Sequence, residues 1–224
     1  MAGTRSGGRL LAASARPRAG VLLAGCAVLV AVLGVLFAHQ STADGFDRAI
    51  DSAVIGWSGG RGDIALRLTY PGSMIPAVAD SAIMAVACLL AGRLRGAVLA
   101  AAAVPAAVGV TEMLLKPLVR RTYLGQVVYP SGHVAAVFAL AAAVTVLLLA
   151  PPRPPPALRA LILAVAYLAA AAVVVGVIGV RFHYFTDTVA GAAVGTGTAC
   201  ALALLLDLNP AVRLSRTPRR SAAS

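Results

Sequence analysis

The sequence predicts an all-α integral membrane protein, a bundle of six transmembrane helices with a short interfacial helix in the first outer loop. Hydrophobic residues make up 60% of the chain and charged residues only 12%, which is typical of a membrane protein rather than a soluble domain. Six apolar runs follow one another, separated by short polar segments. A helix of about 20 apolar residues is long enough to cross roughly 30 Å of hydrocarbon.

The first apolar run extends from residue 19 to residue 38 and follows a segment with four arginines and no acid. This pattern also fits a signal peptide, with a weak cleavage context at Ser41-Thr42-Ala43. Because the run has the length of a complete span, we expect a retained transmembrane helix. Under either interpretation the following loop lies outside.

That loop, residues 39–67, is the most polar part of the chain. Its apolar side chains recur at helical spacing, at Phe46, Ile50, Val54 and Trp57. Asp47, Arg48 and Asp51 lie on the opposite face. The pattern predicts a short helix in the membrane interface, anchored by the only tryptophan of the protein.

Five further apolar runs predict the remaining spans, at residues 70–92, 96–115, 134–150, 157–180 and 188–206. In the last of them, Gly191 and Gly195 form a small-xxx-small pattern that favours close helix packing. We therefore expect a membrane domain at residues 19–206, between a basic cytoplasmic N-terminal tail at residues 1–18 and a basic, disordered cytoplasmic C-terminal tail at residues 207–224.

The distribution of lysine and arginine predicts the orientation of the spans. The side that holds both termini carries 12 of these residues, and the other side carries 7. Because the more basic side of a membrane protein usually faces the cytoplasm, we expect a multi-pass protein of the cytoplasmic membrane with cytoplasmic termini. The loops at residues 116–133 and 181–187 then face outward.

The net charge of +11 would suggest nucleic-acid binding in a soluble protein. Here the basic residues lie in short segments beside apolar runs, where they fit membrane topology and contacts with anionic lipid headgroups. We therefore expect membrane lipids as partners and no nucleic acid. Cys26, Cys88 and Cys200 lie inside apolar runs without metal-ligand spacing, and we interpret them as packing residues.

Two acidic residues fall at membrane depth, where a stranded charge is costly and often functional. Glu112, the only glutamate, precedes Lys116 by four residues, which favours an ion pair on one helix face over a role in proton handling. Asp80 lies within the second span. We expect it to face the bundle interior and to meet an arginine.

Two polar stretches together predict an active site for a phosphate. The first runs from Lys116, the only lysine, through two arginines to Pro130-Ser131-Gly132-His133. The second is His183-Tyr184-Phe185-Thr186-Asp187. Taken singly, the first turn also fits an ordinary helix N-cap, and the His/Asp pair a structural hydrogen bond. Both stretches emerge on the same outer face, which favours a shared site.

Hydrolysis of a lipid phosphate needs cations, a nucleophile, and an acid for the leaving alkoxide. The candidate cations are Lys116, Arg120, Arg121 and Arg181. Ser131 and Gly132 offer a hydroxyl and backbone N–H groups at a helix N-terminus. Because His183 and Asp187 are four residues apart, the carboxylate can accept from one ring nitrogen and leave the other to attack phosphorus. With His133 as the acid, this chemistry requires no metal and no other cofactor.

These stretches resemble the type 2 phosphatidic acid phosphatases, six-span membrane enzymes that include undecaprenyl-diphosphate phosphatases. The resemblance covers roughly residues 46–206, and its strongest parts are the Pro-Ser-Gly-His turn and the stretch from His183 to Asp187. It implies that His183 is the nucleophile that forms a phosphohistidine, that Asp187 orients it, and that His133 protonates the leaving group. It also implies that Lys116 and Ser131 bind the phosphate.

The chain departs from the family pattern at two arginines. The family's first motif has a lysine, six residues, and then Arg-Pro, where this chain has Tyr123-Leu124. The third motif has Ser-Arg ending six residues before the histidine, where this chain has Gly176-Val177. We expect Arg120 or Arg121 to replace the first arginine. Arg181 would replace the second, provided that the helix breaks near His183.

We therefore predict a lipid phosphatase or diphosphatase that acts at the outer face of the membrane. Isoprenoid diphosphates, phosphatidate-like lipids and glycolipid phosphates all fit as the substrate. The alternative is a catalytically weak or inactive lipid-phosphate-binding protein that kept the histidines and lost the arginines. A transporter is disfavoured, because the sequence contains no evident inverted repeat.

Overall fold

The computed structural model describes residues 9–208 and is built almost entirely from helices. Five of these helices are long and apolar enough to cross a membrane, and counting the bent pair α3 (Gly62–Thr69) and α4 (Met74–Leu90) as one span gives six. The predicted all-α membrane bundle is confirmed. The expected basic tails fall largely on residues 1–8 and 209–224, which lie outside the described residues.

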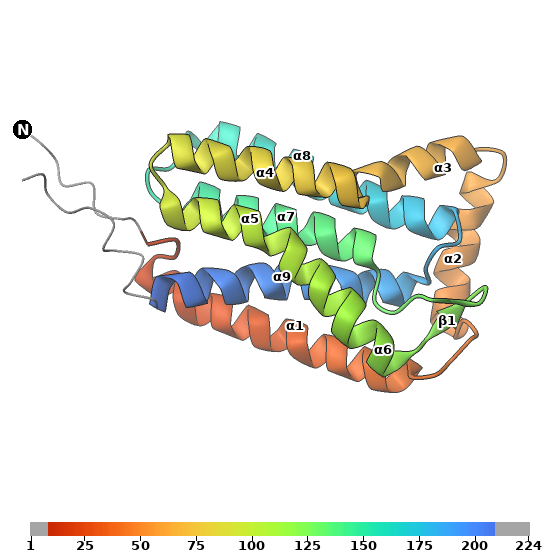
Figure 1. Cartoon of the computed structure of the whole chain (residues 1–224). Coiled ribbons are helices and arrows are strands. Elements are labelled where there is room, and N and C mark those ends of the chain that lie inside the picture. Colours follow the sequence, from red (N-terminus) through yellow and green to blue (C-terminus); the bar gives the residue numbers. More distant parts are fainter. Residues whose placement is uncertain (1–8, 209–224) are drawn as a thin grey trace, which may run out of the picture.

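The spanning helices run side by side along the length of the bundle (Figure 1). They are α1 (Arg16–Phe37), α4, α5 (Leu94–Gly109), α7 (Gly132–Leu149), α8 (Pro156–Gly179) and α9 (Phe185–Leu208). The short helix α2 (Gly45–Ser58) lies across one end, as Figure 1 shows. Both ends of the described chain lie at the opposite end of the bundle.

Helices α7 and α9 form the centre of the bundle and pack through small residues. A Cβ atom added to Gly191 would lie 2.5 Å from the carbonyl oxygen of Ser131 and 3.2 Å from the Cβ of Val134. Gly195 lies equally close to the backbone of α7 at Ala135 and Ala139. The predicted close packing at the two glycines is confirmed, and it holds the first turns of α7 and α9 against each other.

The second span is not straight. Helices α3 and α4 meet at an angle of 40°, separated by the 3-10 turn η2 (Tyr70–Gly72). Pro71 within this turn lacks a backbone N–H, which favours the break. A Cβ atom at Gly72 would lie 2.8 Å from the carbonyl oxygen of His133, so the break brings the chain directly against the start of α7.

Asp80 lies on the exposed outer face of α4. The expectation that it faces the bundle interior is therefore wrong. The interior face of α4 is instead formed by small residues such as Ala77, Ser81 and Ala85, which recur every four residues on one side of the helix.

The third span contains two irregularities before it ends. After α5, the chain continues through the π-helical turn η3 (Val110–Leu115) into the short helix α6 (Lys116–Val119). π-helical turns are rare and occur frequently at functional sites. Here the turn contains Glu112 and ends directly before Lys116.

At the end of the bundle opposite to α2, Asp207 near the end of α9 binds the start of the chain. Its carboxylate accepts the backbone N–H groups of Leu10 at 2.8 Å and Leu11 at 2.9 Å. It also pairs with Arg95 at 3.4 Å and with Arg16 at 3.5 Å. The first helix starts three residues earlier than expected, and its N-terminal end is fastened to the last span.

Candidate active site

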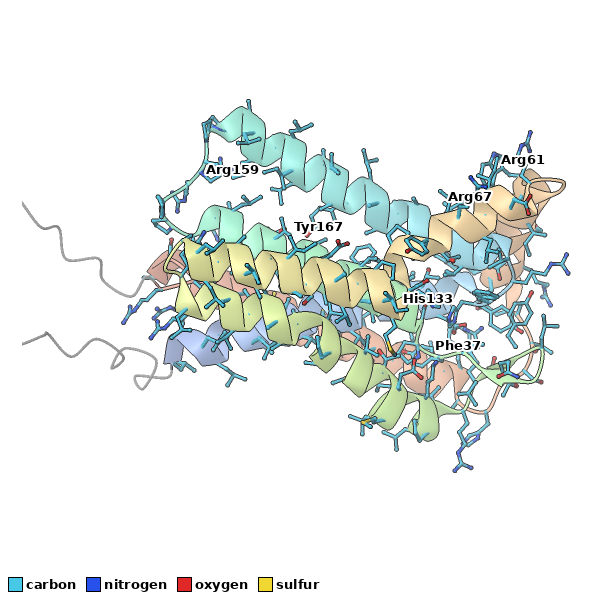
Figure 2. All side chains as sticks on the ribbon, turned by 45° about the horizontal axis from the view of Figure 1, so that its top comes forward. Phe37, Arg61, Arg67, His133, Arg159 and Tyr167 are labelled. Carbon is cyan, nitrogen blue, oxygen red and sulfur yellow. The ribbon has the colours of Figure 1, made fainter. Side chains whose placement is uncertain are left out.

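The two predicted polar stretches meet at the end of the bundle that α2 covers. Figure 2 shows His133 at this end, together with Phe37, Arg61 and Arg67, while Arg159 lies at the far end. Four segments meet here: the start of α7, the turn between α8 and α9, the end of α6, and the loop that follows α6. The predicted convergence of the two stretches is therefore present in the fold.

The turn from Pro130 to His133 starts α7 and is tied to the start of α9. Ser131 is the N-cap, and its hydroxyl accepts from the N–H of Val134 at 3.5 Å. The N–H of Ser131 donates to the carbonyl oxygen of Asp187 at 3.0 Å. Ser131 is fully buried, whereas His133 is half-buried with its ring 6.2 Å from that of Phe182.

His183 lies in the turn between the last two helices. Helix α8 ends at Gly179, Arg181 adopts a left-handed conformation with φ of 60°, and α9 starts at Phe185. Arg181 can replace the family's second arginine only if the helix breaks near His183, and this break is present. The side chain of His183 is buried, at 7% exposure, which places it under the surface of the site.

The imidazole of His183 is neutral at physiological pH. Burial lowers its pKa to about 3, and the positive charges of Lys116 and His133 act in the same direction. A neutral imidazole has a lone pair available for attack, whereas an imidazolium does not. Lys116 and His133 are therefore close enough to His183 to affect its pKa, so the three predicted side chains lie near one another.

Asp187 lies beside His183 but does not form a hydrogen bond with it. The distance from His183 Nδ1 to Asp187 Oδ2 is 3.9 Å, and Nδ1 has no other partner in the described part of the chain. Oδ2 of Asp187 accepts the N–H of Tyr184 at 3.0 Å instead. Catalytic hydrogen bonds are often longer without substrate and shorten in the complex.

Lys116 is paired with Glu112, as the spacing of four residues predicted. Its Nζ donates to both carboxylate oxygens, at 2.7 and 2.9 Å. The pair lies against α7, because a Cβ atom at Gly132 would be 2.8 Å from Glu112 Oε1. A cavity of about 370 Å³ opens here. Its lining residues are Glu112, Lys116, Pro117, Arg120, Thr122 and Val127.

The three candidate arginines occupy different environments. Arg120 is exposed beside Lys116 in this cavity, and its Nε donates to the carbonyl oxygen of Pro117 at 3.1 Å. Arg181 is exposed too, and its positive charge acts on Tyr123, whose pKa burial raises. Arg121 is fully buried.

Arg121 binds carboxylates of the protein. Its guanidinium donates to Asp187 Oδ1 and Thr186 Oγ1, each at 2.7 Å, and to Asp47 Oδ2 at 2.5 Å. Only its Nε has no hydrogen-bond partner in the described part of the chain. Because the whole side chain is buried, Arg121 lacks the exposure that a ligand of the substrate phosphate needs. Of the two adjacent arginines, only Arg120 lies where a phosphate can approach Lys116.

The positions where the family has its two other arginines are structured differently here. Tyr123 and Leu124 belong to a hairpin of β1 (Thr122–Tyr123) and β2 (Gln126–Val127), with positive φ at Leu124 and Gly125. Gly176 packs on α3, where a Cβ atom would lie 2.9 Å from the carbonyl oxygen of Ala65. Val177 is fully buried. The position in α8 therefore leaves no space for an arginine, whereas the position in the hairpin is partly exposed and holds a tyrosine.

Asp47 and Thr186 also belong to this site, although the sequence does not predict them as site residues. The helical spacing predicts Asp47 on the polar face of an interfacial helix. In the fold this face turns inward, so that Asp47 and Asp51 are buried against the start of α9. The spacing of acidic and apolar residues in α2 predicts two different helix faces, but it does not predict which of the two is buried against the bundle. In the described part of the chain, no cluster of three His, Cys, Asp or Glu side chains is arranged to hold a metal ion.

A family model described as the PAP2 superfamily matches residues 116–210. This match begins at Lys116 and includes both polar stretches of the site, in agreement with the resemblance predicted from them. Searches of curated proteins and of solved structures gave no match.

Proposed function

We propose that this protein hydrolyses a lipid phosphate or a polyprenyl diphosphate at the outer face of the membrane, because residues 116–210 match the model of the PAP2 superfamily. Similarity to this superfamily supports phosphatase activity on lipid phosphates in general. The observation that carries the proposal is the buried, neutral His183 under the combined influence of Lys116 and His133. A neutral imidazole near the positive charge of Lys116 suits attack on an anionic phosphorus centre.

In the first step, Nε2 of His183 forms a bond to phosphorus while the bond from phosphorus to the leaving oxygen breaks. Protonated His133 gives its proton to that oxygen, which leaves as the lipid alcohol or the lipid monophosphate. In the second step, neutral His133 takes a proton from water, whose oxygen displaces the histidine from phosphorus. Phosphate is released, and both histidines return to their starting states.

Phosphate binding falls to Lys116 and Arg120, which line the cavity at the start of α7. The backbone N–H groups of the first turn of α7, at Gly132 and His133, point toward the same region and favour an anion there. Ser131 supplies the cap that orients this turn. Arg181 completes the set if the turn around it rotates toward His183, which its exposed position permits.

The orientation follows from the charge distribution. The order of the apolar runs predicts twelve basic residues on the side of the termini and seven on the side of the site. Under the positive-inside rule, the site faces outward from the cytoplasmic membrane. A lipid phosphate in the outer leaflet can then reach Lys116 with its headgroup while its chains stay among the exposed apolar side chains of the same helical segment, such as Met113 and Leu118.

A weak or inactive lipid-phosphate-binding protein remains the second candidate, and one observation favours it. Arg121 is committed to internal carboxylates, and the charge of Arg181 acts on Tyr123. The site therefore has fewer arginines at His183 than the family pattern. Each missing charge-assisted hydrogen bond would weaken transition-state binding by about 1.5–3 kcal/mol.

The test is phosphate release by the purified full chain in detergent with EDTA present. The substrates are undecaprenyl diphosphate, phosphatidate and a glycolipid phosphate, and the variants are His183→Ala and the matched control His39→Asn. His39 is exposed, and its backbone N–H donates to the carbonyl oxygen of Val119 at the end of α6, so it lies at the same end of the bundle. We expect release that survives chelation, vanishes in His183→Ala and persists in His39→Asn, with phosphate trapped on His183 after an alkaline quench. Binding of these lipids without release would favour the second candidate.

A further inference from the structure

We propose that Asp47 and Arg121 are positioning residues that hold the carboxylate of Asp187 in place and, through it, the nucleophile His183. This inference rests on the proposed phosphatase function. It assigns the buried arginine a role other than phosphate binding, and it gives the helix α2 a part in catalysis.

The three side chains form a continuous buried chain of contacts. Arg121 donates from one terminal nitrogen to Asp187 Oδ1 at 2.7 Å and from the other to Asp47 Oδ2 at 2.5 Å. All three are fully buried, at 0% exposure. Charge-assisted hydrogen bonds of this kind are short and directional, and a guanidinium presents its donors in a fixed plane. The position of Arg121 therefore sets the position of Asp187.

Two aromatic rings fix the plane of the guanidinium. Its central carbon lies 4.0 Å from the ring centroid of Phe37 and 4.3 Å from that of Tyr184. Phe37 is the last residue of α1, and Tyr184 follows the nucleophile directly. Stacking on both faces leaves the guanidinium its edge for hydrogen bonds, which is the edge that meets the two carboxylates.

Asp47 reinforces the arrangement from the side of α9. Its Oδ1 accepts the N–H of Thr186 at 2.9 Å, and its Oδ2 accepts the Thr186 hydroxyl at 3.0 Å. Arg121 donates to the same hydroxyl at 2.7 Å. The residue that precedes Asp187 is thus held by both partners, so the first turn of α9 has little freedom to rotate.

The net charge of the group formed by Asp47, Arg121 and Asp187 explains why two carboxylates bind one arginine. A guanidinium paired with Asp187 alone would cancel the negative charge that orients and stabilises a histidine cation. Asp47 supplies a second negative charge, so that the three groups together carry a charge of −1. With Oδ1 of Asp187 bound to Arg121, the oxygen that faces His183 Nδ1, at 3.9 Å, is Oδ2.

The test compares Asp47→Asn with Asp51→Asn in the full-length protein. Both residues are buried acids on the same face of α2, and Asp51 accepts the N–H of Phe185 at 3.1 Å without touching Arg121. We expect Asp47→Asn to lower kcat by about 10²-fold with little change in KM, the loss that a misplaced catalytic group causes. Asp51→Asn keeps an amide oxygen for Phe185 and should stay within about threefold of wild type.

A double-variant cycle with Asp187→Asn separates positioning from general damage. If Asp47 acts through Asp187, adding Asp47→Asn to Asp187→Asn should lower kcat little further, because the two losses are not additive. Full additivity of the two losses would overturn the proposal, as would a normal kcat in Asp47→Asn. A parallel loss of kcat in Asp51→Asn would also overturn it, since that result indicates general distortion of α2.

A second measurement does not depend on hydrolysis. Diethyl pyrocarbonate modifies neutral imidazoles, and mass spectrometry can follow its reaction at His183 in each variant. We expect the rate to fall about tenfold in Asp47→Asn and Arg121→Lys, and to be unchanged in Asp51→Asn. If the wild type hydrolyses no lipid phosphate, the proposed function fails, while this comparison still decides whether Asp47 and Arg121 set the reactivity of His183. Equal rates in all variants would overturn the inference.

Discussion

At the scale of single residues, the two adjacent arginines of the loop after α6 show how one backbone conformation separates neighbours. Arg120 ends α6 in the left-handed region, with φ of 53°. This conformation is uncommon for a residue with a side chain and reverses the chain direction. Arg120 consequently stays at the surface beside Lys116, and Arg121 enters the interior between two carboxylates. Arg120 is therefore available to a ligand in the cavity, whereas Arg121 binds two carboxylates of the protein.

His183 makes a prediction for the pH dependence of stability. Its pKa is about 3 in the folded protein and 6.5 ordinarily, so the unfolded chain binds more protons between these values. Its contribution to stability is complete above pH 6.5 and is lost as the pH falls toward 3. By pH 5 the loss amounts to about 2 kcal/mol, because one pKa unit corresponds to about 1.4 kcal/mol.

The measurement is the apparent Tm in detergent at pH 7.5 and pH 5, for wild type and His183→Gln. The wild type should lose several degrees more than the variant on acidification. Burial raises the pKa of Asp51 to about 7, with repulsion from Asp47 adding to it, so its contribution has the opposite sign. That contribution is common to both proteins and cancels in the comparison. An equal drop in both proteins would contradict the prediction.

At the scale of elements, the contact between α7 and α9 joins the two halves of the site. Ser131 and Asp187 belong to the first turns of these helices and are linked by a backbone hydrogen bond of 3.0 Å. Gly191, one turn beyond Asp187, lets the backbones approach at this point. The separation of His133 and His183, the two proposed catalytic histidines, is therefore set by the packing of α7 against α9.

Gly191→Ala should separate the two helices and impair the site. The added methyl group would lie 2.5 Å from the carbonyl oxygen of Ser131, which is backbone and cannot move aside alone. We expect destabilisation of about 1–3 kcal/mol and a clear loss of phosphate release. Measurements of the apparent Tm and of kcat would check this.

Gly25→Ala in α1 is the matched control. A Cβ atom at Gly25 meets nothing within 4 Å, so this variant should keep activity and gain up to about 1 kcal/mol from the better helix propensity of alanine. Similar behaviour of the two variants would show that the close approach at Gly191 is not what holds the site together.

At the scale of the whole molecule, the basic turns and the candidate active site lie at opposite ends of the bundle. One end carries both ends of the described chain and the basic turns that include Arg159, and the other end carries α2 and the site (Figures 1 and 2). Exposed apolar side chains cover the sides, among them Val35, Ile75 and Leu168. This distribution fits a protein whose two ends face different aqueous compartments and whose sides face lipid.

Cysteine labelling of intact cells would test the predicted orientation. Arg61→Cys lies at the end of the site, where Arg61 is exposed, and Arg159→Cys lies at the opposite end, where Arg159 is half-buried. A membrane-impermeant maleimide should label the first variant in intact cells and the second only after lysis. Cys26, Cys88 and Cys200 lie inside helices and provide the background, which the wild type measures. Labelling with the reverse pattern would place the site in the cytoplasm.

Sequence alone predicted the architecture of this protein, which the structure confirms, and the residues of the proposed active site. Apolar runs of span length, helical spacing in α2 and the i,i+4 pair of Glu112 and Lys116 depend on local periodicity, which a sequence displays directly. The two polar stretches matched a family through residues that are neighbours in the chain. These features required no knowledge of which helix packs against which.

Only the tertiary structure shows which buried side chains contact the predicted site residues. The inward face of α2, the burial of Arg121 and the exposure of Asp80 depend on how the helices rotate about their axes, and the uniformly apolar spans carry little information about that rotation. Contacts such as that of Asp47 with Arg121 join residues 74 positions apart. Such contacts exist only after packing has chosen one face of each helix, and for that reason the sequence predicted which groups act on the phosphate but not which groups hold them.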